Sequence, residues 1–252
     1  MRIRDLIHRY KTDEKFRNKF NLYNGAMTSL VFTCVQLYGG IRYQSVWFFA
    51  FGVYYGVLTI VKFYLAHWVG VKGKKGWKVF RTVGFVMSLL NIALIVMISI
   101  MVANPAIVFH EYSLVIAIIT GAWTLISAGM TVRSVAEMHN KNDPVALADR
   151  LVNLTTAAVS VLMLQTSLIA SISTPQIETV KGYIEQFGSF ANIPETISGW
   201  FTDLFQRLAT SNSITGSIVA IFTSGITVYM IIRGTVERKK LEKSASSEKK
   251  VD

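Results

Sequence analysis

The sequence predicts an all-α, polytopic membrane protein with six transmembrane helices and with both termini in the cytoplasm. Three observations support this prediction: a low content of charge, apolar residues that gather in blocks, and basic residues that alternate between the connections. Of the 252 residues, 52% are hydrophobic and only 16% are charged. About a quarter of the residues in an average soluble domain are charged, so the composition favours the membrane class.

Six apolar stretches are long enough to cross the hydrocarbon core as helices, which takes about 20 residues. The second stretch is longer than a crossing needs and contains Lys62 near its end. We therefore expect this helix to tilt, or Lys62 to snorkel to the headgroups. The first five stretches form a transmembrane region over 22–172, and the sixth helix covers 213–234. The six apolar stretches are 22–41, 45–69, 79–103, 112–132, 151–172 and 213–232.

The basic residues fix the expected orientation. Of the 26 Lys and Arg residues, 22 lie in the segments 1–21, 70–81, 133–150 and 233–252, which would share one side of the membrane. Basic connections stay in the cytoplasm, so the sequence predicts that these segments are inside. The net charge of +11 then follows from topology, and no nucleic-acid partner is expected.

Two further segments are expected to lie along the membrane surface. Residues 1–21 mix apolar and basic side chains, as a cytoplasmic interfacial helix does. The outer connection 173–212 contains apolar residues at helical spacing after Pro194, which predicts an amphipathic helix on the bilayer or over the bundle. Interfacial anchoring and a ligand lid remain open for it. The tail 235–252 is expected to be a disordered basic segment. The apolar face of the outer helix consists of Ile197, Trp200, Phe201, Leu204, Phe205 and Leu208.

Acidic residues are absent from much of the predicted membrane region. No Asp or Glu lies between Leu22 and His110, although cation sites in membranes normally use carboxylates. The four histidines lie at helix ends or in connections, and Cys34 is the single cysteine. The sequence therefore predicts no metal site, no cofactor and no enzyme activity.

Neutral polar residues are what the sequence places at membrane depth. Two interpretations of them remain open. They could join helices by hydrogen bonds, each contributing about 0.6 kcal/mol, or they could line a cavity for a small solute or a weakly held ion. Gln36 and Thr155 are polar residues of the same kind. The residues predicted to line a solute cavity are Tyr54, Tyr55, Asn91, Asn153, Thr156 and Gln165.

Small residues recur at helical spacing in two of the predicted helices. Such ridges let helix backbones approach one another closely in a membrane. Packing within one chain and packing across a dimer interface are both consistent with the pattern. The small residues are Gly52 and Gly56 in the second helix, and Gly216, Ala220 and Ser224 in the sixth.

The connection between the second and third helices is strongly basic. Topology alone would explain its charge, and contact with anionic lipid headgroups is the functional alternative. Its basic residues are Lys72, Lys74, Lys75, Lys78 and Arg81.

Two stretches carry a resemblance to a known family. Asn24 to Tyr55 reads N-x(14)-G-G-x(4)-S-V-x(7)-Y-Y, and 143–160 reads D-P-V-A-L-A-D-R-L-V-N-L-T-T-A-A-V-S. Together they resemble a family of uncharacterised six-helix membrane proteins of Gram-positive bacteria, over most of 12–172. The resemblance implies a location in the bacterial cell membrane and supplies no activity.

A more distant resemblance is to the transmembrane domain of cation diffusion facilitators. Gly40 and Ser45 match that family's first turn, and 143–149 matches the segment before its fifth helix. The resemblance implies a homodimeric transporter scaffold from which the zinc site has been lost, because the ligand positions hold other residues. These positions align with Tyr54, Leu58, Val152 and Thr156.

Two functional hypotheses follow from the sequence. The first is a transporter-like membrane protein built on this scaffold without the acidic and histidine metal site, its solute unknown. The alternative is a non-transporting membrane subunit, a lipid-binding scaffold or an assembly factor. The expected partners are the bilayer, anionic lipid at the cytoplasmic face and a second copy of the chain.

Overall fold

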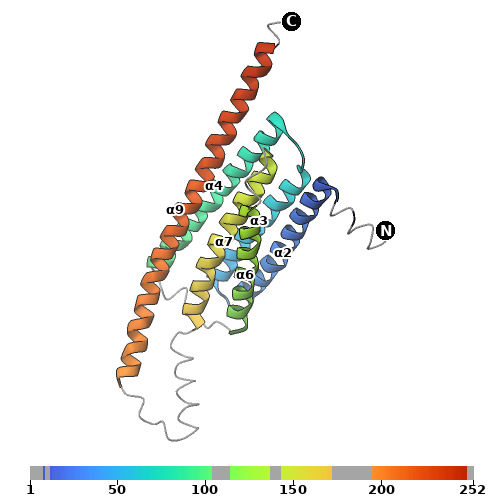
Figure 1. The fold of residues 1–252 in the computed structure, drawn as a ribbon. Coiled ribbons are helices and arrows are strands. Elements are labelled where there is room, and N and C mark those ends of the chain that lie inside the picture. Colours follow the sequence, from blue (N-terminus) through green and yellow to red (C-terminus); the bar gives the residue numbers. More distant parts are fainter. Residues whose placement is uncertain (1–7, 9–11, 104–113, 137–142, 172–194, 249–252) are drawn as a thin grey trace.

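The computed structural model describes residues 8, 12–103, 114–136, 143–171 and 195–248, and within that part of the chain every regular element is a helix (Figure 1). Four of these helices are long and apolar enough to cross a membrane, over Val46–His67, Gly73–Ile100, Pro144–Ser167 and Ser213–Ser247. The molecule thus has the architecture of a helical membrane protein. The helices are α2 (Glu14–Arg42), α3 (Val46–His67), α4 (Gly73–Ala103), α6 (Leu114–Ala136), α7 (Pro144–Ser171) and α9 (Glu195–Glu248).

Helices α2 and α3 form an antiparallel hairpin with a very short turn. Gln44 adopts a positive φ of 50° in that turn, and the Ser45 hydroxyl caps α3 by accepting a hydrogen bond from the Phe48 amide at 3.4 Å. A Cβ atom on Gly40 would lie 2.6 Å from the backbone nitrogen of Phe49. The two helices can therefore meet this closely at the turn only because residue 40 has no side chain.

The turn between α3 and α4 also depends on glycine. Gly70 and Gly73 have φ values of 80° and 67°, a region that side chains disfavour. A Cβ on Gly76 in the first turn of α4 would lie 2.7 Å from Cγ of Pro144, the first residue of α7. The α3–α4 turn, the start of α7 and the C-terminal part of α9 thus share one end of the bundle. We call it the basic end, and the opposite one the α2–α3 end.

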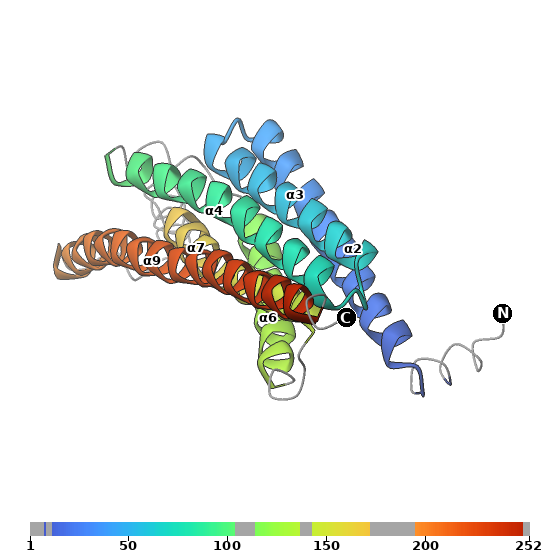
Figure 2. The ribbon, with the colours of Figure 1, turned by 90° about the horizontal axis from the view of Figure 1, so that it is seen from above.

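Helix α7 is the centre of the bundle. It packs against α3, α4, α6 and α9, and Figure 2 shows it between α4 and α9. Its start is well defined, because a carboxylate oxygen of Asp143 accepts hydrogen bonds from the amides of Val145 and Ala146 at 2.9 and 3.3 Å. Proline suits the first position of a helix, where its missing N–H is not needed.

Helices α4 and α9 form a long antiparallel pair whose contacts recur every seven residues. A Cβ on Gly84 would lie 2.9 Å from Cβ of Met230, and a Cβ on Gly216 would lie 3.2 Å from Ile98. Midway between them, Asn91 and Thr223 are hydrogen-bonded. Repeats of seven residues keep one seam of each helix against its partner, as in coiled coils.

Large apolar side chains also cover much of the outside of the bundle. Exposed apolar residues on this scale fit a surface that contacts lipid. The interior combines such residues with aromatic rings, among which Phe48, Phe51 and Tyr55 are fully buried. The most exposed outer residues include Val31, Tyr38, Ile41, Val46, Ile60, Leu89, Leu125 and Ile221.

Helix α9 differs from the prediction. The sequence suggested a sixth helix over 213–234, an outer helix within 173–212 and a disordered tail over 235–252. The structure instead has one helix of 54 residues from Glu195 to Glu248. At 1.5 Å per residue it is about 80 Å long, well beyond the ~30 Å hydrocarbon core. Residues 173–194 and 249–252 lie outside the described part.

Other helices also begin earlier than the apolar stretches indicate. Helix α7 begins at Pro144, whereas the apolar stretch begins at 151, and α4 begins at Gly73. Helix α2 begins at Glu14, inside the segment 1–21, whose residues 1–7 and 9–11 lie outside the described part. Hydropathy marks only the apolar portion of a helix, while capping groups such as Asp13, whose side chain accepts from the Phe16 amide at 3.1 Å, set its start.

A substitution at the α4–α9 seam tests this packing. Leucine at Gly84 must displace Met230 or Ile231, so Gly84→Leu is expected to destabilise the protein by roughly 1–3 kcal/mol. Gly225 of α9 has nothing within 4 Å of its ideal Cβ position, so Gly225→Leu is the matched control. Thermal unfolding in detergent measures both; equal melting temperatures for the two variants would contradict the register.

Candidate functional site

A charged side chain is buried within the bundle. Lys62 of α3 is only 1% exposed, and its Nζ donates a hydrogen bond to Oγ of Ser29 on α2 at 3.0 Å. The expectation that Lys62 snorkels to the headgroups is therefore wrong. The hairpin with α2 turns the side chain toward the interior, where a neighbouring hydroxyl receives it.

The counter-charge comes from α7. Asp149 is close enough to Lys62 and Arg150 for the charges to interact, and its Oδ2 accepts a hydrogen bond from Nδ2 of Asn153 at 3.3 Å. The sequence analysis assigned Asp149 to a cytoplasmic connection, 133–150. Because α7 begins at Pro144, Asp149 instead lies in the second turn of a helix and beside α3. Periodicity from Pro144 onward was the signal that would have found it.

The Lys62 ammonium is incompletely paired. Lys62 and Asp149 both belong to the described residues, and no direct ion pair joins them there, although their charges interact across the α3–α7 interface. Ser29 is the one hydrogen-bond partner that the described residues give to the Lys62 ammonium, which has three donors. Ionisable groups buried at membrane depth are costly and usually mark a functional site.

A separate hydroxyl network lies about three turns further along α7. The Tyr55 hydroxyl of α3 is 2.8 Å from Oγ of Ser160, and Ser160 donates to Ser127 of α6 at 3.3 Å. Thr124 donates to the Ser160 carbonyl at 3.1 Å. Three helices are thus joined by hydroxyl groups at one level of the bundle.

Aromatic rings surround this network on the α2 side. Phe32 stacks on Trp123 with ring centroids 4.3 Å apart and nearly parallel planes. Tyr55 meets Phe32 edge-on at 4.9 Å. Such offset and edge contacts stabilise packed aromatics beyond their buried area, so they hold the Tyr55 hydroxyl in place against α7.

Helix α6 presents a stripe of hydroxyl residues to α7. Thr131 donates to its own helix at Ser127 and to the Asn153 carbonyl of α7, at 2.8 and 3.0 Å. Small hydroxyl residues let two helices approach closely while their polar groups stay paired. The stripe contains Thr120, Thr124, Ser127 and Thr131, spaced four, three and four residues apart and all buried.

The six residues predicted to line a solute cavity do not form one cluster. The Tyr55 hydroxyl is bonded to Ser160 of α7, the helix that also contains Asn153 and Thr156, and Tyr54 is buried beside Tyr55. Asn91 belongs to a different interface, because it is hydrogen-bonded to Thr223 and Ser224 of α9. Gln165 is half-buried nearer the other end of α7. The contacts thus support hydrogen bonding between helices for Asn91, and a shared polar region for the residues on α3 and α7.

The small residues lie at contacts between helices of one chain. A Cβ on Gly52 would lie 2.7 Å from Leu37 of α2, and on Gly56 3.5 Å from Thr33. On α9, Gly216 packs on Ile98, Ala220 is buried and Ser224 is hydrogen-bonded to Asn91. Sequence reasoning missed Gly84 and Gly234, the latter 2.9 Å from Cβ of Arg81; the seven-residue spacing would have indicated Gly84.

The basic connection remains largely exposed. Lys72, Lys74, Lys75 and Lys78 are exposed, while Arg81 is half-buried against Gly234. Nζ of Lys74 forms an ion pair with Glu242 of α9 at 3.1 Å. Four cationic groups at one end of the bundle are thus accessible to anionic headgroups.

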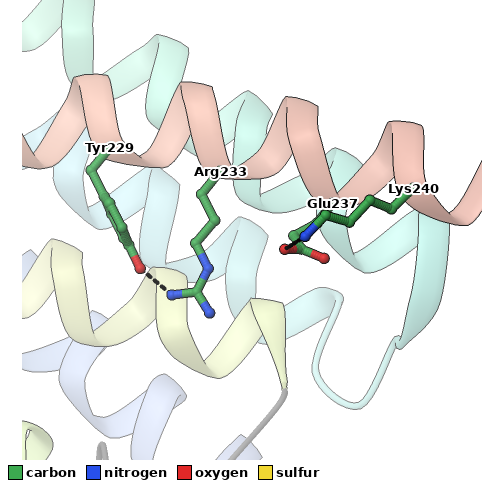
Figure 3. Close-up of polar contacts among 4 residues, drawn as sticks. All are labelled: Tyr229, Arg233, Glu237 and Lys240. Carbon is green, nitrogen blue, oxygen red and sulfur yellow. Dashed lines mark hydrogen bonds and ion pairs between the residues drawn. The ribbon is translucent and has the colours of Figure 1, made fainter.

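Helix α9 has a mixed aromatic and charged face at the same end (Figure 3). The Arg233 guanidinium lies over the Trp77 ring at 5.6 Å and donates a hydrogen bond to the Tyr229 hydroxyl. One turn further, Lys240 pairs with Glu237 at 3.1 Å. Aromatic and basic residues together are typical of the boundary between membrane and water.

The described residues contain no group of three or more His, Cys, Asp or Glu side chains that could hold a metal ion. The chain matches no family model, no curated protein and no solved structure. What the protein does must therefore be inferred from its own side chains.

A double-mutant cycle tests the interaction between Lys62 and Asp149. Each single change leaves one buried charge less compensated, so Lys62→Met and Asp149→Asn are each expected to destabilise the protein, by up to about 3 kcal/mol. Asp149→Asn should cost more, because Asp149 also interacts with Arg150, whereas the structure gives Lys62 one carboxylate. The double variant should recover about 1 kcal/mol relative to additivity.

Denaturant unfolding in mixed micelles gives the four free energies of the cycle. Lys78→Met, at an exposed position of α4, serves as the control and should have little effect. Strict additivity of the two single changes would mean that the charges do not interact.

Proposed function

We propose that this chain is a transporter-like integral membrane protein, with the polar groups around α7 forming its solute path. The observation that supports this most is the buried Lys62. Its ammonium has one hydroxyl partner, Ser29, and interacts with the charge of Asp149 without a direct ion pair. A purely structural bundle would be at least as stable with apolar residues in place of both Lys62 and Asp149. A lysine retained at this position is explained by a solute that it contacts during transport.

The proposal includes six membrane-spanning helices with both termini in the cytoplasm. Helices α2 and α6, with 29 and 23 residues, pack beside the long apolar spans and expose large apolar side chains such as Val31 and Leu125. The exposed lysines of the α3–α4 turn share one end with the basic part of α9. Because basic segments stay inside, this end would face the cytoplasm.

Labelling of single cysteines tests that orientation. In a Cys34→Ser background, Gln44→Cys at the α2–α3 turn is expected to react with a membrane-impermeant maleimide in intact cells. Lys72→Cys at the α3–α4 turn should react only after permeabilisation. Both positions are exposed, so the reverse pattern would contradict the orientation.

The distant kinship with cation diffusion facilitators, a homodimeric assembly and a bacterial cell membrane location belong to the same proposal. They rest on the sequence patterns around Gly40, Ser45 and 143–149. The ligand positions of that family fall at Tyr54, Leu58, Val152 and Thr156, which are all buried on α3 and α7. A solute other than zinc would then use the same interface between the two helices.

Solute flux into proteoliposomes tests transport. Purified protein is expected to accelerate uptake of at least one solute from a panel of inorganic ions, amides, polyols and small carboxylates. Lys62→Met and Asp149→Asn should each lower that flux at least tenfold, because they remove the charges that the solute path contains. Lys78→Met should leave the flux unchanged, and an absence of flux above protein-free liposomes for the whole panel would overturn the proposal.

The basic end supports a second function, a lipid-binding scaffold or a non-transporting subunit. Lys72, Lys75 and Lys78 are exposed next to the C-terminal part of α9, and each basic residue near an anionic surface contributes about 1 kcal/mol of attraction. Thermal stabilisation by added anionic lipid, lost when these lysines become Gln, together with the absence of flux, would favour this function over transport.

A further inference from the structure

Toward the α2–α3 end, four buried side chains contain polar atoms that no described residue pairs. They are both amide atoms of Gln36, the hydroxyls of Thr120 and Ser167, and the indole nitrogen of Trp47. Their exposures are 1%, 0%, 1% and 5%. Buried polar atoms are nearly always paired, so such groups on adjoining helices indicate a partner outside the protein.

One stacking contact relates Gln36 to Thr120. Phe32 of α2 stacks on Trp123 of α6 with ring centroids 4.3 Å apart, and the two helices run in opposite directions (Figure 1). Gln36 lies one turn beyond Phe32, and Thr120 lies one turn beyond Trp123 toward the same end. Residues three or four apart share a helix face, so Gln36 and Thr120 are on facing sides at adjoining levels.

A hydrogen bond relates Thr120 to Ser167 in the same way. Ser127 and Ser160 are bonded at 3.3 Å across the α6–α7 interface. Two turns further toward the α2–α3 end, on each of the two antiparallel helices, lie Thr120 and Ser167. A step of seven residues returns to nearly the same face. Gln36, Thr120 and Ser167 thus lie at adjoining levels of α2, α6 and α7, toward the α2–α3 end.

The surroundings are free of formal charge. The segments 22–41, 43–61, 114–132 and 151–171 contain no Asp, Glu, Lys, Arg or His. An ion at this level would find no counter-charge, whereas an uncharged molecule needs only hydrogen bonds. The Gln36 amide offers one acceptor oxygen and a donor nitrogen side by side, an arrangement that a primary amide complements with its own pair.

We propose that Gln36, Thr120 and Ser167 bind a small uncharged amide, of the class of acetamide or urea. This inference rests on the proposed transport function and deepens it, since it gives the class of solute and one binding site on the path of that solute. The solute would meet this neutral site in one half of the bundle and the Lys62 group in the other.

Acetamide and acetate form a matched pair of probes, because they have nearly the same shape and differ in charge. Acetamide at tens of millimolar is expected to raise the melting temperature of the protein in nanodiscs, since a ligand that binds only the folded state stabilises it, and acetate is not. Proteoliposomes should take up acetamide faster than protein-free liposomes in stopped-flow swelling.

Two substitutions remove the polar groups with little change of volume, Gln36→Leu and Thr120→Val. Each is expected to abolish the acetamide-dependent shift and to lower acetamide flux at least tenfold. Because the Gln36 amide has no protein partner, the unliganded Gln36→Leu variant should be at least as stable as the wild type, which a purely structural role would not predict. Asn24→Leu, at an exposed amide of the same helix, is the matched control and should behave as the wild type.

The outcomes separate this inference from the transport proposal. Flux of an ion that depends on Lys62, without any response to acetamide, would overturn the amide site and leave transport standing. An acetamide-dependent shift that Gln36→Leu removes, without flux of any solute, would support the site and overturn transport. An equal response to acetate, or a response that survives both substitutions, would overturn the amide site.

Discussion

The absence of hydrogen-bonding solvent in the hydrocarbon core is the constraint on which this bundle depends. Backbone groups meet it by forming helices, and polar side chains must find partners inside the protein. Thr124 and Thr131 do so twice, since each hydroxyl bonds to its own helix and to a carbonyl of α7. Helix α7 receives most of these bonds and packs against four other helices. The central position of α7 thus follows from the hydrogen bonds that its carbonyls accept from hydroxyl groups of a neighbouring helix.

Helix backbones must also approach one another closely for the bundle to form. Lipid tails are as apolar as the side chains that they contact, so the burial of apolar surface alone does not drive helix association. Contact distance then decides which helices pair. Gly40 and Gly52 bring α2 against α3, and Gly84 and Gly216 bring α4 against α9. The α4–α9 pair joins segments far apart in the chain, and midway along it Asn91 is hydrogen-bonded to Thr223. An asparagine at one seam position fixes register in coiled coils, at some cost in stability.

Hydropathy predicted the helical class and the presence of the four long spans, because those depend on local composition. It placed the starts of α4 and α7 too late, since capping by Asp143 and the interfacial turns lie outside the apolar windows. That error hid Asp149, and with it the partner of Lys62. The continuity of α9 was missed because a polar stretch in a helix resembles a connection by composition alone. Which polar residues pair, and which stay unpaired as Gln36 does, depends on tertiary register that a single sequence does not contain.

The polar groups around α7 divide the bundle into two unlike halves. Near the basic end, Lys62 and Asp149 lie within two turns of helix ends, and each charge is partly offset by the other. Toward the α2–α3 end, the polar groups are neutral and surrounded by aromatic rings, so a charge there would lack both solvent and counter-ion. Between the halves, the Tyr55–Ser160–Ser127 bonds close the interface with hydroxyls that can each donate and accept. Hydroxyls of this kind can exchange one hydrogen-bond partner for another, but they offer no counter-charge to an ion. The middle of the bundle therefore resembles the α2–α3 end, whose polar groups are neutral, more than it resembles the basic end.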